Sequence, residues 1–482
     1  NRGEYTFDEL LERWAKTARR LGVYLYMSYW TGDHDMPPGM NGANLAYLRT
    51  KIPAVAKAGA TSMDCQAGNN WGLYGRGYYI TNKLMWNPNA DVDVLLADFY
   101  EKAFGPAAPA MRRYYERLDP GNHPLMSPHL LGLTLRDVEE ATRLAKDRPD
   151  VLARLAQIQQ YLHYVRLRWD YDHESNVENK LALGAAGMTQ AYRTRYTYMN
   201  HWNAVRAWGR EMSREYNKPE WNDPKVPKPW EVETFPTPQE TERTFREDLV
   251  YFQPQEMLQA TFSERLLPAG LTEPEPAGLM LKLIRGACFV LYSRQGEPLE
   301  CTIAAGTLEG RSNRPDAAYT LTDGAGKVIL AGRLPQDGAA HSLKIAVPAA
   351  GAYRLAVNDY GTGWQIDMPA DRPAVLALLA DYGPMQIGIG RMYFFVPKGT
   401  RKFQYYWSGQ AHDVRGPDGK VVKQVDARDA YVTCDVPAGM DGKAWSFTRF
   451  RLGTIFFQNI PNYLAASPDA LLMPAELAGK ER

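Results

Sequence analysis

The sequence predicts a multidomain fold in which an α/β segment is followed by a helical segment and then by β-sandwiches. Three observations lead to this fold class. Apolar strands alternate with helical patterns as far as residue 118, apolar residues recur every three or four positions through the next segment, and the period switches to two after residue 252. The length of 482 residues agrees, because a domain usually has about 100 to 200 residues. We place the domains at 1–118, 119–252, 253–380 and 381–482.

The first segment is predicted to hold two β/α units. Its expected elements, in chain order, are a helix at 7–21, a strand at 23–30, a helix at 44–58, a strand at 60–66, a helix at 78–86 and a helix after Pro88. Two strands buried between helices belong to a larger parallel sheet, because a free pair would leave apolar faces and edges uncovered. The chain enters its first helix without an initiating Met, so we expect it to begin within a longer protein.

The second segment is expected to be a packed helical domain. Apolar stripes at helical spacing cover residues 151–169 and 188–212, and a proline-rich connector follows at 218–238. Continuing the first stripe places Asp172 and His173 on its inward side. We favour a structural hydrogen-bonded pair there over an edge of a substrate cleft.

The last part is expected to form two β-sandwiches with a seam near residues 376–386. Short strands with a period of two are separated by turn dipeptides such as Asp-Gly. The strands are expected at 279–292, 318–321, 327–330, 342–347, 353–357, 391–396, 402–407 and 430–436. Residues 294–297 could turn a hairpin that brings Cys288 and Cys301 onto adjacent strands. A disulfide between them is open, but free buried thiols are favoured.

Charge and hydropathy argue against two classes of protein. Lys and Arg number 56 against 55 Asp and Glu, a net charge of +1, so the sequence lacks the basic character of a dedicated nucleic-acid binder. The most apolar stretch, 279–292, is too short for a membrane span and contains Lys282 and Arg285. We therefore expect neither a nucleic-acid partner nor a membrane partner. The 29 Tyr and 12 Trp against 15 Phe suit sugar contacts, although strand propensity explains them equally well.

Several motifs resemble a known family. LYGRGYYITNKLMWNPNADV (73–92), DFYEKAFGPAA (98–108) and residues 114–118 resemble the end of a glycosidase-type (β/α)8 barrel. Residues 393–400, 436–447 and 459–472 are similar to the accessory sandwich of the same family. This is a bacterial domain-of-unknown-function family related in architecture to α-glucuronidases and β-hexosaminidases. The resemblance covers residues 1–118 and 391–474 well and the middle of the chain weakly.

The resemblance implies a fold, a partner and a location. The two strands would be the last two of a (β/α)8 barrel, and the first six would come from a second polypeptide or from sequence not included in this chain. The general acid of related barrels would then lie outside this chain. The resemblance also implies a secreted or periplasmic protein that acts on a carbohydrate substrate.

Barrel enzymes carry their chemistry in the loops that follow the carboxyl ends of the strands. Glycoside cleavage needs two carboxyl groups, one as acid and one as nucleophile or base. The candidate catalytic residues are Asp64, then Asp33, then Asp35, with Asp64 first because it comes directly after apolar strand residues. For each of them, a loop cap or helix N-cap is the stronger alternative.

The same loops supply the candidate substrate-binding residues. Aromatic rings for stacking and polar groups for sugar hydroxyls are offered by Tyr26, Tyr29, Trp30, His34, Gln66, Asn70, Trp71 and Tyr74. Arg76 matches a substrate carboxylate and would favour a uronic acid, or it pairs with a structural Asp. A metal site at residues 33–35 is disfavoured, because adjacent residues seldom reach one ion.

The function predicted from these residues is a glycoside hydrolase-like protein acting on a polysaccharide or oligosaccharide. The alternative is a non-catalytic carbohydrate-binding or scaffolding protein that uses sandwich residues such as Tyr405, Tyr406 and Trp407. A polysaccharide lyase with Tyr and His as base and acid stays open. Metalloprotease, nucleotide-binding and serine-hydrolase motifs are absent from the sequence, and we expect no cofactor and no metal.

Overall fold

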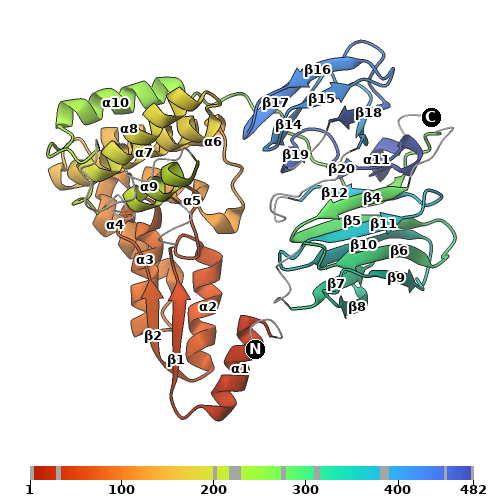
Figure 1. The fold of residues 1–482 in the computed structure, drawn as a ribbon, viewed down its shortest axis with the longest axis horizontal. Coiled ribbons are helices and arrows are strands. Elements are labelled where there is room, and N and C mark those ends of the chain that lie inside the picture. Colours follow the sequence, from red (N-terminus) through yellow and green to blue (C-terminus); the bar gives the residue numbers. More distant parts are fainter. Residues whose placement is uncertain are drawn as a thin grey trace. The chain divides into compact units, whose positions relative to one another are not determined.

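The computed structural model divides the chain into two compact units, which are described separately (Figure 1). One unit is Asp8–Gln255, and the other joins Asn1–Phe7 to Glu256–Arg482. The structure describes residues 5–28, 34–198, 204–215, 230–272, 278–308, 315–379, 390–449 and 453–478. The proline-rich connector predicted at 218–238 lies largely outside these ranges.

The Asp8–Gln255 unit begins with α1 (Phe7–Thr17), β1 (Leu21–Tyr26), α2 (Leu45–Lys57), β2 (Ala60–Gln66) and α3 (Trp71–Trp86). Strands β1 and β2 are parallel, and among the described residues they pair only with each other. The predicted order of elements is confirmed, whereas the structure does not show a complete barrel. Figure 1 shows the carboxyl ends of both strands pointing toward the helices of the same unit.

Helix α3 begins earlier than the helix predicted at 78–86. Asn70 is its N-cap, and its side-chain oxygen accepts a hydrogen bond from the backbone N–H of Leu73. The first two turns contain three glycines, which are weak helix formers. A Cβ on Gly77 would lie only 1.5 Å from the carbonyl oxygen of Gly42, so close backbone packing requires glycine there.

The rest of this unit is helical. Its long helices are α4 (Val92–Phe104), α5 (Ala108–Arg117), α6 (Pro128–Leu144), α7 (Pro149–His173), α8 (Val177–Arg193), α9 (Ala204–Glu215) and α10 (Pro238–Tyr251), and its short 3-10 turns are η1 (Gly105–Ala107) and η2 (Pro120–Asn122). The apolar stripe predicted over 188–212 is divided between two helices, because α8 ends at Arg193. One hydrophobic core extends from β1 through α10, so the α/β and helical segments fold together.

The other unit is β-rich, and its sheets are antiparallel. A six-stranded sheet has the order β20-β12-β5-β10-β7-β8, and a four-stranded sheet has the order β4-β11-β6-β9. A second four-stranded sheet has the order β13-β18-β15-β16, and a three-stranded sheet has the order β17-β14-β19. Aromatic contacts join sheets across the core, Phe289 against Trp364 at 6.1 Å between ring centroids and Phe394 against Phe403 at 5.4 Å. Such facing sheets are typical of β-sandwiches.

The elements of this unit have the following bounds. They are β3 (Leu266–Pro268), β4 (Leu279–Leu283), β5 (Gly286–Ser293), β6 (Leu299–Ala305), β7 (Ala317–Thr322), β8 (Val328–Leu334), β9 (Ala340–Ile345), β10 (Gly351–Asn358), β11 (Trp364–Met368), β12 (Ala374–Ala377), β13 (Met392–Val396), β14 (Lys402–Trp407), β15 (His412–Arg415), β16 (Val421–Val425), β17 (Ala430–Asp435), β18 (Lys443–Thr448), β19 (Ile455–Phe457), β20 (Tyr463–Leu464), η4 (Pro468–Ala470), β21 (Leu472–Pro474) and α11 (Ala475–Ala478). Strands β3 and β21 form a separate antiparallel pair.

The prediction of a hairpin that brings Cys288 and Cys301 onto adjacent strands is wrong. Cys288 lies on β5 of the six-stranded sheet and Cys301 on β6 of the facing four-stranded sheet, because the turn between them crosses from one sheet to the other. Both thiols are buried and free. Burial raises the pKa of Cys301 to about 12, which keeps this thiol protonated.

The described residues contain neither a membrane-spanning helix nor a metal-binding cluster. No helix among them is long and apolar enough to cross a membrane. No group of three or more His, Cys, Asp or Glu side chains in the described ranges is arranged to hold a metal ion.

Candidate functional site

The turn after β1, at residues 34–35, is held in an unusual backbone conformation. His34 and Asp35 both have positive φ angles, 48° and 57°, a region that costs a non-glycine residue about 1 to 3 kcal/mol. Two buried tyrosines of α7 hold this turn. Tyr164 donates its hydroxyl to the carbonyl oxygen of His34, and Tyr161 donates to that of Asp35, each at 2.7 Å. The helical segment therefore fixes the backbone at His34 and Asp35, two of the predicted site residues.

The side chain of His34 ends a charged array that runs across α9 and α7. Its Nε2 lies 2.9 Å from Oε2 of Glu211 on α9. The same carboxylate oxygen accepts from Nη1 of Arg168 at 2.9 Å, and Nη2 of Arg168 pairs with Oδ1 of Asp172 at 2.7 Å. Asp172 thus pairs with Arg168 and not with His173, which stacks on Trp169. The arrangement alternates charges, so each ion has a compensating neighbour.

The aromatic side chain of Trp208 packs against this array. Trp208, one turn before Glu211 on α9, is fully buried and meets the ring of His34 edge to face at 6.2 Å between centroids. The guanidinium of Arg168 lies 4.7 Å from the centre of the Trp208 ring, within reach of a cation–π interaction. The indole N–H of Trp208 donates to the Tyr164 hydroxyl at 2.8 Å. Trp208 therefore supports the same tyrosine that holds the turn.

The electrostatics of the array keep Glu211 ionised. Burial raises the pKa of its carboxyl, but hydrogen bonds from His34 and Arg168 outweigh burial and bring the pKa down to about 2. For Arg168, burial lowers the pKa, and the two carboxylates overcome that effect and raise it. Glu211 is therefore unsuited to donate a proton as a general acid. It is suited to orient the imidazole of His34 as an acceptor of the Nε2 proton.

The buried polar atoms that make no hydrogen bond within the described part of the chain include a ring nitrogen and an amide nitrogen near the strand ends. One is Nδ1 of His34, in the turn after β1, and the other is Nδ2 of Asn70, in the loop after β2. Nearly all buried polar groups in proteins have a partner, so such atoms point to a ligand or a water molecule. A Cβ placed on Gly72 would meet both the Tyr161 ring at 2.9 Å and Oδ1 of Asn70 at 3.2 Å. Asn70 is thus packed near the tyrosine that holds the Asp35 carbonyl.

The structure brings only some of the predicted site residues to this position. His34, Asp35 and Asn70 lie near α7, and Asp35 is buried. Trp71 packs edge to face against Tyr78, with 5.7 Å between ring centroids, and its carbonyl oxygen accepts from the Tyr115 hydroxyl.

The other aromatic and polar candidates have different surroundings. Tyr74 is fully buried and stacks on Tyr78, and its hydroxyl accepts from the N–H of Met40 at 3.2 Å. Tyr26 is 45% exposed on the strand, and Gln66 accepts from the Tyr24 hydroxyl at 2.9 Å. Tyr29, Trp30 and Asp33 lie outside the described residues.

Two charged candidates lie away from the gathered residues. Asp64 lies within β2 opposite Tyr24 and is exposed, so it does not follow the strand as the sequence suggested. Arg76 is buried, with Nη2 at 2.5 Å from Oδ2 of Asp119 and at 2.9 Å from the carbonyl oxygen of Ala43. Of the two roles considered for Arg76, the structural ion pair is the one present.

The sandwich residues considered for glycan binding are core residues. Tyr405 and Trp407 are fully buried and Tyr406 is 4% exposed. Their strand, β14, lies between β17 and β19, and packing covers both faces of the strand. The expectation that these three rings form a binding surface is wrong, because they fill the interior.

Apart from Asp172, sequence reasoning missed the helical half of the site. Tyr161, Tyr164, Arg168 and Asp172 recur at spacings of three and four, which places them on one face of α7. This pattern was available, but their partners are the turn after β1 and Glu211, and no local signal links positions so far apart in sequence.

Comparison with known proteins found one family model that matches the N-terminal part of the chain. Residues 1–116 match the family described as Domain of unknown function (DUF4838). The match covers β1, β2, the turn with His34 and Asp35, and the Asn70 cap. No curated protein matches the chain.

Proposed function

We propose that this protein is glycoside hydrolase-like, acts on a polysaccharide or oligosaccharide, and binds a sugar between the turn after β1, the start of α3 and the facing sides of α7 and α9. The observation that carries the proposal is that two buried atoms after the ends of two parallel strands, Nδ1 of His34 and Nδ2 of Asn70, have no hydrogen-bond partner among the described residues. With Nε2–H directed to Glu211, Nδ1 is an acceptor, whereas Nδ2 is a donor. A hydroxyl group both donates and accepts, so sugar hydroxyls match this pair.

The proposed chemistry uses the carboxyl groups near this pair. Glycoside cleavage needs one protonated and one ionised carboxyl group. Glu211 is held ionised and positions His34. Asp35 is buried beside the same turn, and Asp33 precedes it. We assign the ionised partner of the reaction to this turn and the general acid to strands outside this chain.

Further strands are part of the proposal. Strands β1 and β2 form a parallel pair with no other partner among the described residues, and Tyr24 is 50% exposed on β1. Parallel sheets normally have more strands and are covered on both faces. We propose that β1 and β2 complete a (β/α)8 barrel whose remaining strands come from a second polypeptide or from another part of a longer protein. We also propose a secreted or periplasmic location.

Asn70→Ser tests the site without removing the helix cap. The serine hydroxyl can accept the hydrogen bond from Leu73 as Asn70 does, but it lacks the amide donor. We expect Asn70→Ser to weaken binding of oligosaccharides in a glycan array, scored by titration, by about tenfold, the usual effect of losing one buried hydrogen bond. Asn44→Ser is the matched control, because Asn44 caps α2 in the same way, with Oδ1 at 2.9 Å from the N–H of Tyr47.

A second variant addresses the other half of the pair. In His34→Gln the side-chain amide can still donate to Glu211, while the atom equivalent to Nδ1 is gone. Equal glycan affinity of the wild type, Asn70→Ser and His34→Gln would refute the proposed site.

The non-catalytic alternative is favoured by one observation. Glu211, the carboxylate that pairs with His34, is also paired with Arg168, so its role is structural, and Nδ1 of His34 and Nδ2 of Asn70 are groups that can bind a ligand without reacting. Release of reducing sugar by the purified chain would support hydrolysis. Tight glycan binding without release of reducing sugar, even when a polypeptide carrying further strands is added, would favour a carbohydrate-binding protein.

A further inference from the structure

A pocket lies between α7, α8 and α10, and no site residue discussed above lines it. Its volume is about 250 Å³, and its walls include Gln160, His163, Gln190, Arg193 and Arg243. The size is below the roughly 300 to 1,000 Å³ of pockets for drug-sized ligands, so it suits one small molecule.

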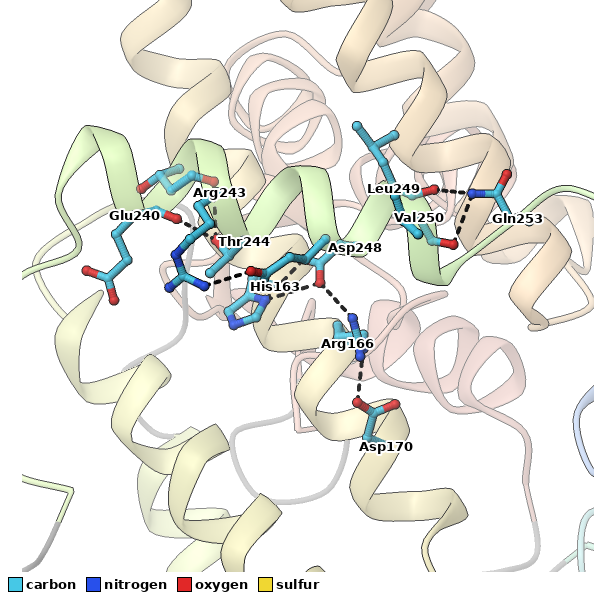
Figure 2. A network of polar contacts seen from close by, with 12 residues as sticks. His163, Arg166, Asp170, Glu240, Arg243, Thr244, Asp248, Leu249, Val250 and Gln253 are labelled. Carbon is cyan, nitrogen blue, oxygen red and sulfur yellow. Dashed lines mark hydrogen bonds and ion pairs between the residues drawn. The ribbon is translucent and has the colours of Figure 1, made fainter.

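His163 is oriented from behind by a buried carboxylate. Nδ1 of His163 lies 3.1 Å from Oδ2 of Asp248, which is fully buried, and Oδ1 of Asp248 is 3.2 Å from Nη1 of Arg166 (Figure 2). Arg166 in turn pairs with Asp170 at 2.9 Å. Asp248 does not line the pocket, whereas His163 does, so the ring stands between the carboxylate and the pocket. With the Nδ1 proton directed to Asp248, Nε2 is left as an acceptor on the ring edge away from it.

The two arginines of the pocket differ in how they are used. Arg193 makes a bidentate pair with Glu240, at 2.6 and 2.8 Å, and also donates to the carbonyl oxygens of Thr234 and Phe235. These contacts hold the Arg193 side chain in place, and Glu240 neutralises its charge. Arg243 is 60% exposed, and in the described part of the chain its Nη1 pairs with the exposed Glu247 one turn away at 2.8 Å. Exposed pairs of this kind contribute little, so Arg243 is the cation available to a ligand.

Two side-chain amides complete the polar lining. Gln160 donates its amide N–H to the Thr241 hydroxyl, and Gln190 donates to the carbonyl oxygen of Gln160, so within the described residues both carboxamide oxygens can accept from a ligand. Convergent polar groups of this kind suit a polyhydroxylated ligand.

We propose that this pocket binds a sugar acid, with its carboxylate on Arg243 and a hydroxyl donating to Nε2 of His163. The lining charges support this ligand: Arg193 and Glu240 neutralise each other, and Arg243, whose partner Glu247 is exposed and does not line the pocket, is the lining cation that a carboxylate can reach. A neutral sugar lacks the group that uses Arg243, and a simple carboxylate lacks the hydroxyls that use His163 and the carboxamides. The site is separate from the one proposed at His34 and Asn70.

Titration calorimetry of the full chain with D-glucuronate, D-glucose and acetate tests this inference. Arg243→Gln removes the cation. His163→Asn keeps an amide N–H for Asp248 but has no equivalent of Nε2. Arg246→Gln is the matched control, because Arg246 lies on the same helix, is 74% exposed, pairs with Glu242 one turn away and does not line the pocket. Each titration is repeated in the Asn70→Ser background, which separates this pocket from the site at the strand ends.

The expected result is saturable binding of glucuronate at one site that persists in Asn70→Ser. Glucose and acetate should bind at least about tenfold more weakly, and Arg243→Gln and His163→Asn should each weaken glucuronate binding by about tenfold or more. Arg246→Gln should have no effect. Absence of glucuronate binding, equal binding by Arg243→Gln and Arg246→Gln, or loss in Arg243→Gln without loss in His163→Asn would overturn the proposal.

Discussion

Glu211 offers a quantitative test of the charged array, because its ionisation depends on identified partners. Glu211→Gln keeps the length of the side chain and an acceptor for Arg168, but it cannot ionise. The carboxyl pKa falls from 4.5 to about 2 in the folded chain. At about 1.36 kcal/mol for each tenfold change in proton affinity, ionised Glu211 contributes roughly 3 kcal/mol to folding at pH 7. Its side chain is only 19% exposed, so solvent screening removes little of this amount.

The sign of the pH effect follows from a folded-state pKa below the unfolded one. The contribution of Glu211 is complete above the unfolded pKa of 4.5 and disappears as the pH falls through about 2. Between pH 7 and pH 3 it should decrease by about 2 kcal/mol. The stability difference between the wild type and Glu211→Gln should decrease by the same amount, because titrations elsewhere in the chain are common to both proteins.

Urea unfolding followed by circular dichroism at 222 nm measures this difference, since the long helices all lie within residues 8–255 of the described chain. Glu242→Gln is the control, because Glu242 is 65% exposed in a pair with Arg246 and should show no such pH dependence. A gap between the wild type and Glu211→Gln that is the same at pH 7 and pH 3 would refute an ionised Glu211 with a lowered pKa.

Three further predictions concern burial and packing elsewhere in the chain. Asp119→Ala should destabilise the protein by about 3 to 5 kcal/mol in urea unfolding, because it leaves the buried guanidinium of Arg76 without its charge partner. Gly77→Ala should cost more than about 4 kcal/mol or abolish soluble expression, since the new methyl group would lie 1.5 Å from the carbonyl oxygen of Gly42. In the native protein a thiol reagent should label the half-buried Cys65 first and reach the three buried cysteines only on unfolding, and equal rates at all four would contradict the described burial.

Local signals in the sequence predicted elements where those signals were strong. Helix α2 begins at its Asn44 cap and ends before Gly59, as the sequence indicated. The start of α3 was missed because glycines obscure its helical pattern, and the reason for the glycine at 77, contact with Gly42, is a tertiary one. The hairpin expected after Cys288 failed for a related reason, since a short turn between strands does not reveal whether the chain stays in one sheet or crosses to the facing one.

The sequence predicted those residues of the candidate site that follow the ends of the two strands. The rule that parallel strands present function at their carboxyl ends led to His34, Asp35 and Asn70. The same rule cannot separate a ligand contact from a structural one, and it included Arg76, whose partner Asp119 is distant in sequence. Glu211 could not be predicted as a site residue, because a lone acidic residue on an amphipathic helix is most often exposed to solvent.

The extent of the family match bears on what the functional unit is. The match ends at residue 116, but the turn after β1 owes its conformation to residues beyond that point. His34 and Asp35 adopt costly left-handed conformations, and the hydroxyls of Tyr164 and Tyr161 and the carboxylate of Glu211 hold them there. A fragment that ends at residue 118 would keep the turn's sequence and lose every one of these contacts, so the turn would relax toward ordinary backbone angles. The helical segment is therefore part of the site, and homologues of the 1–116 domain that lack an equivalent of α7 and α9 should not share its geometry.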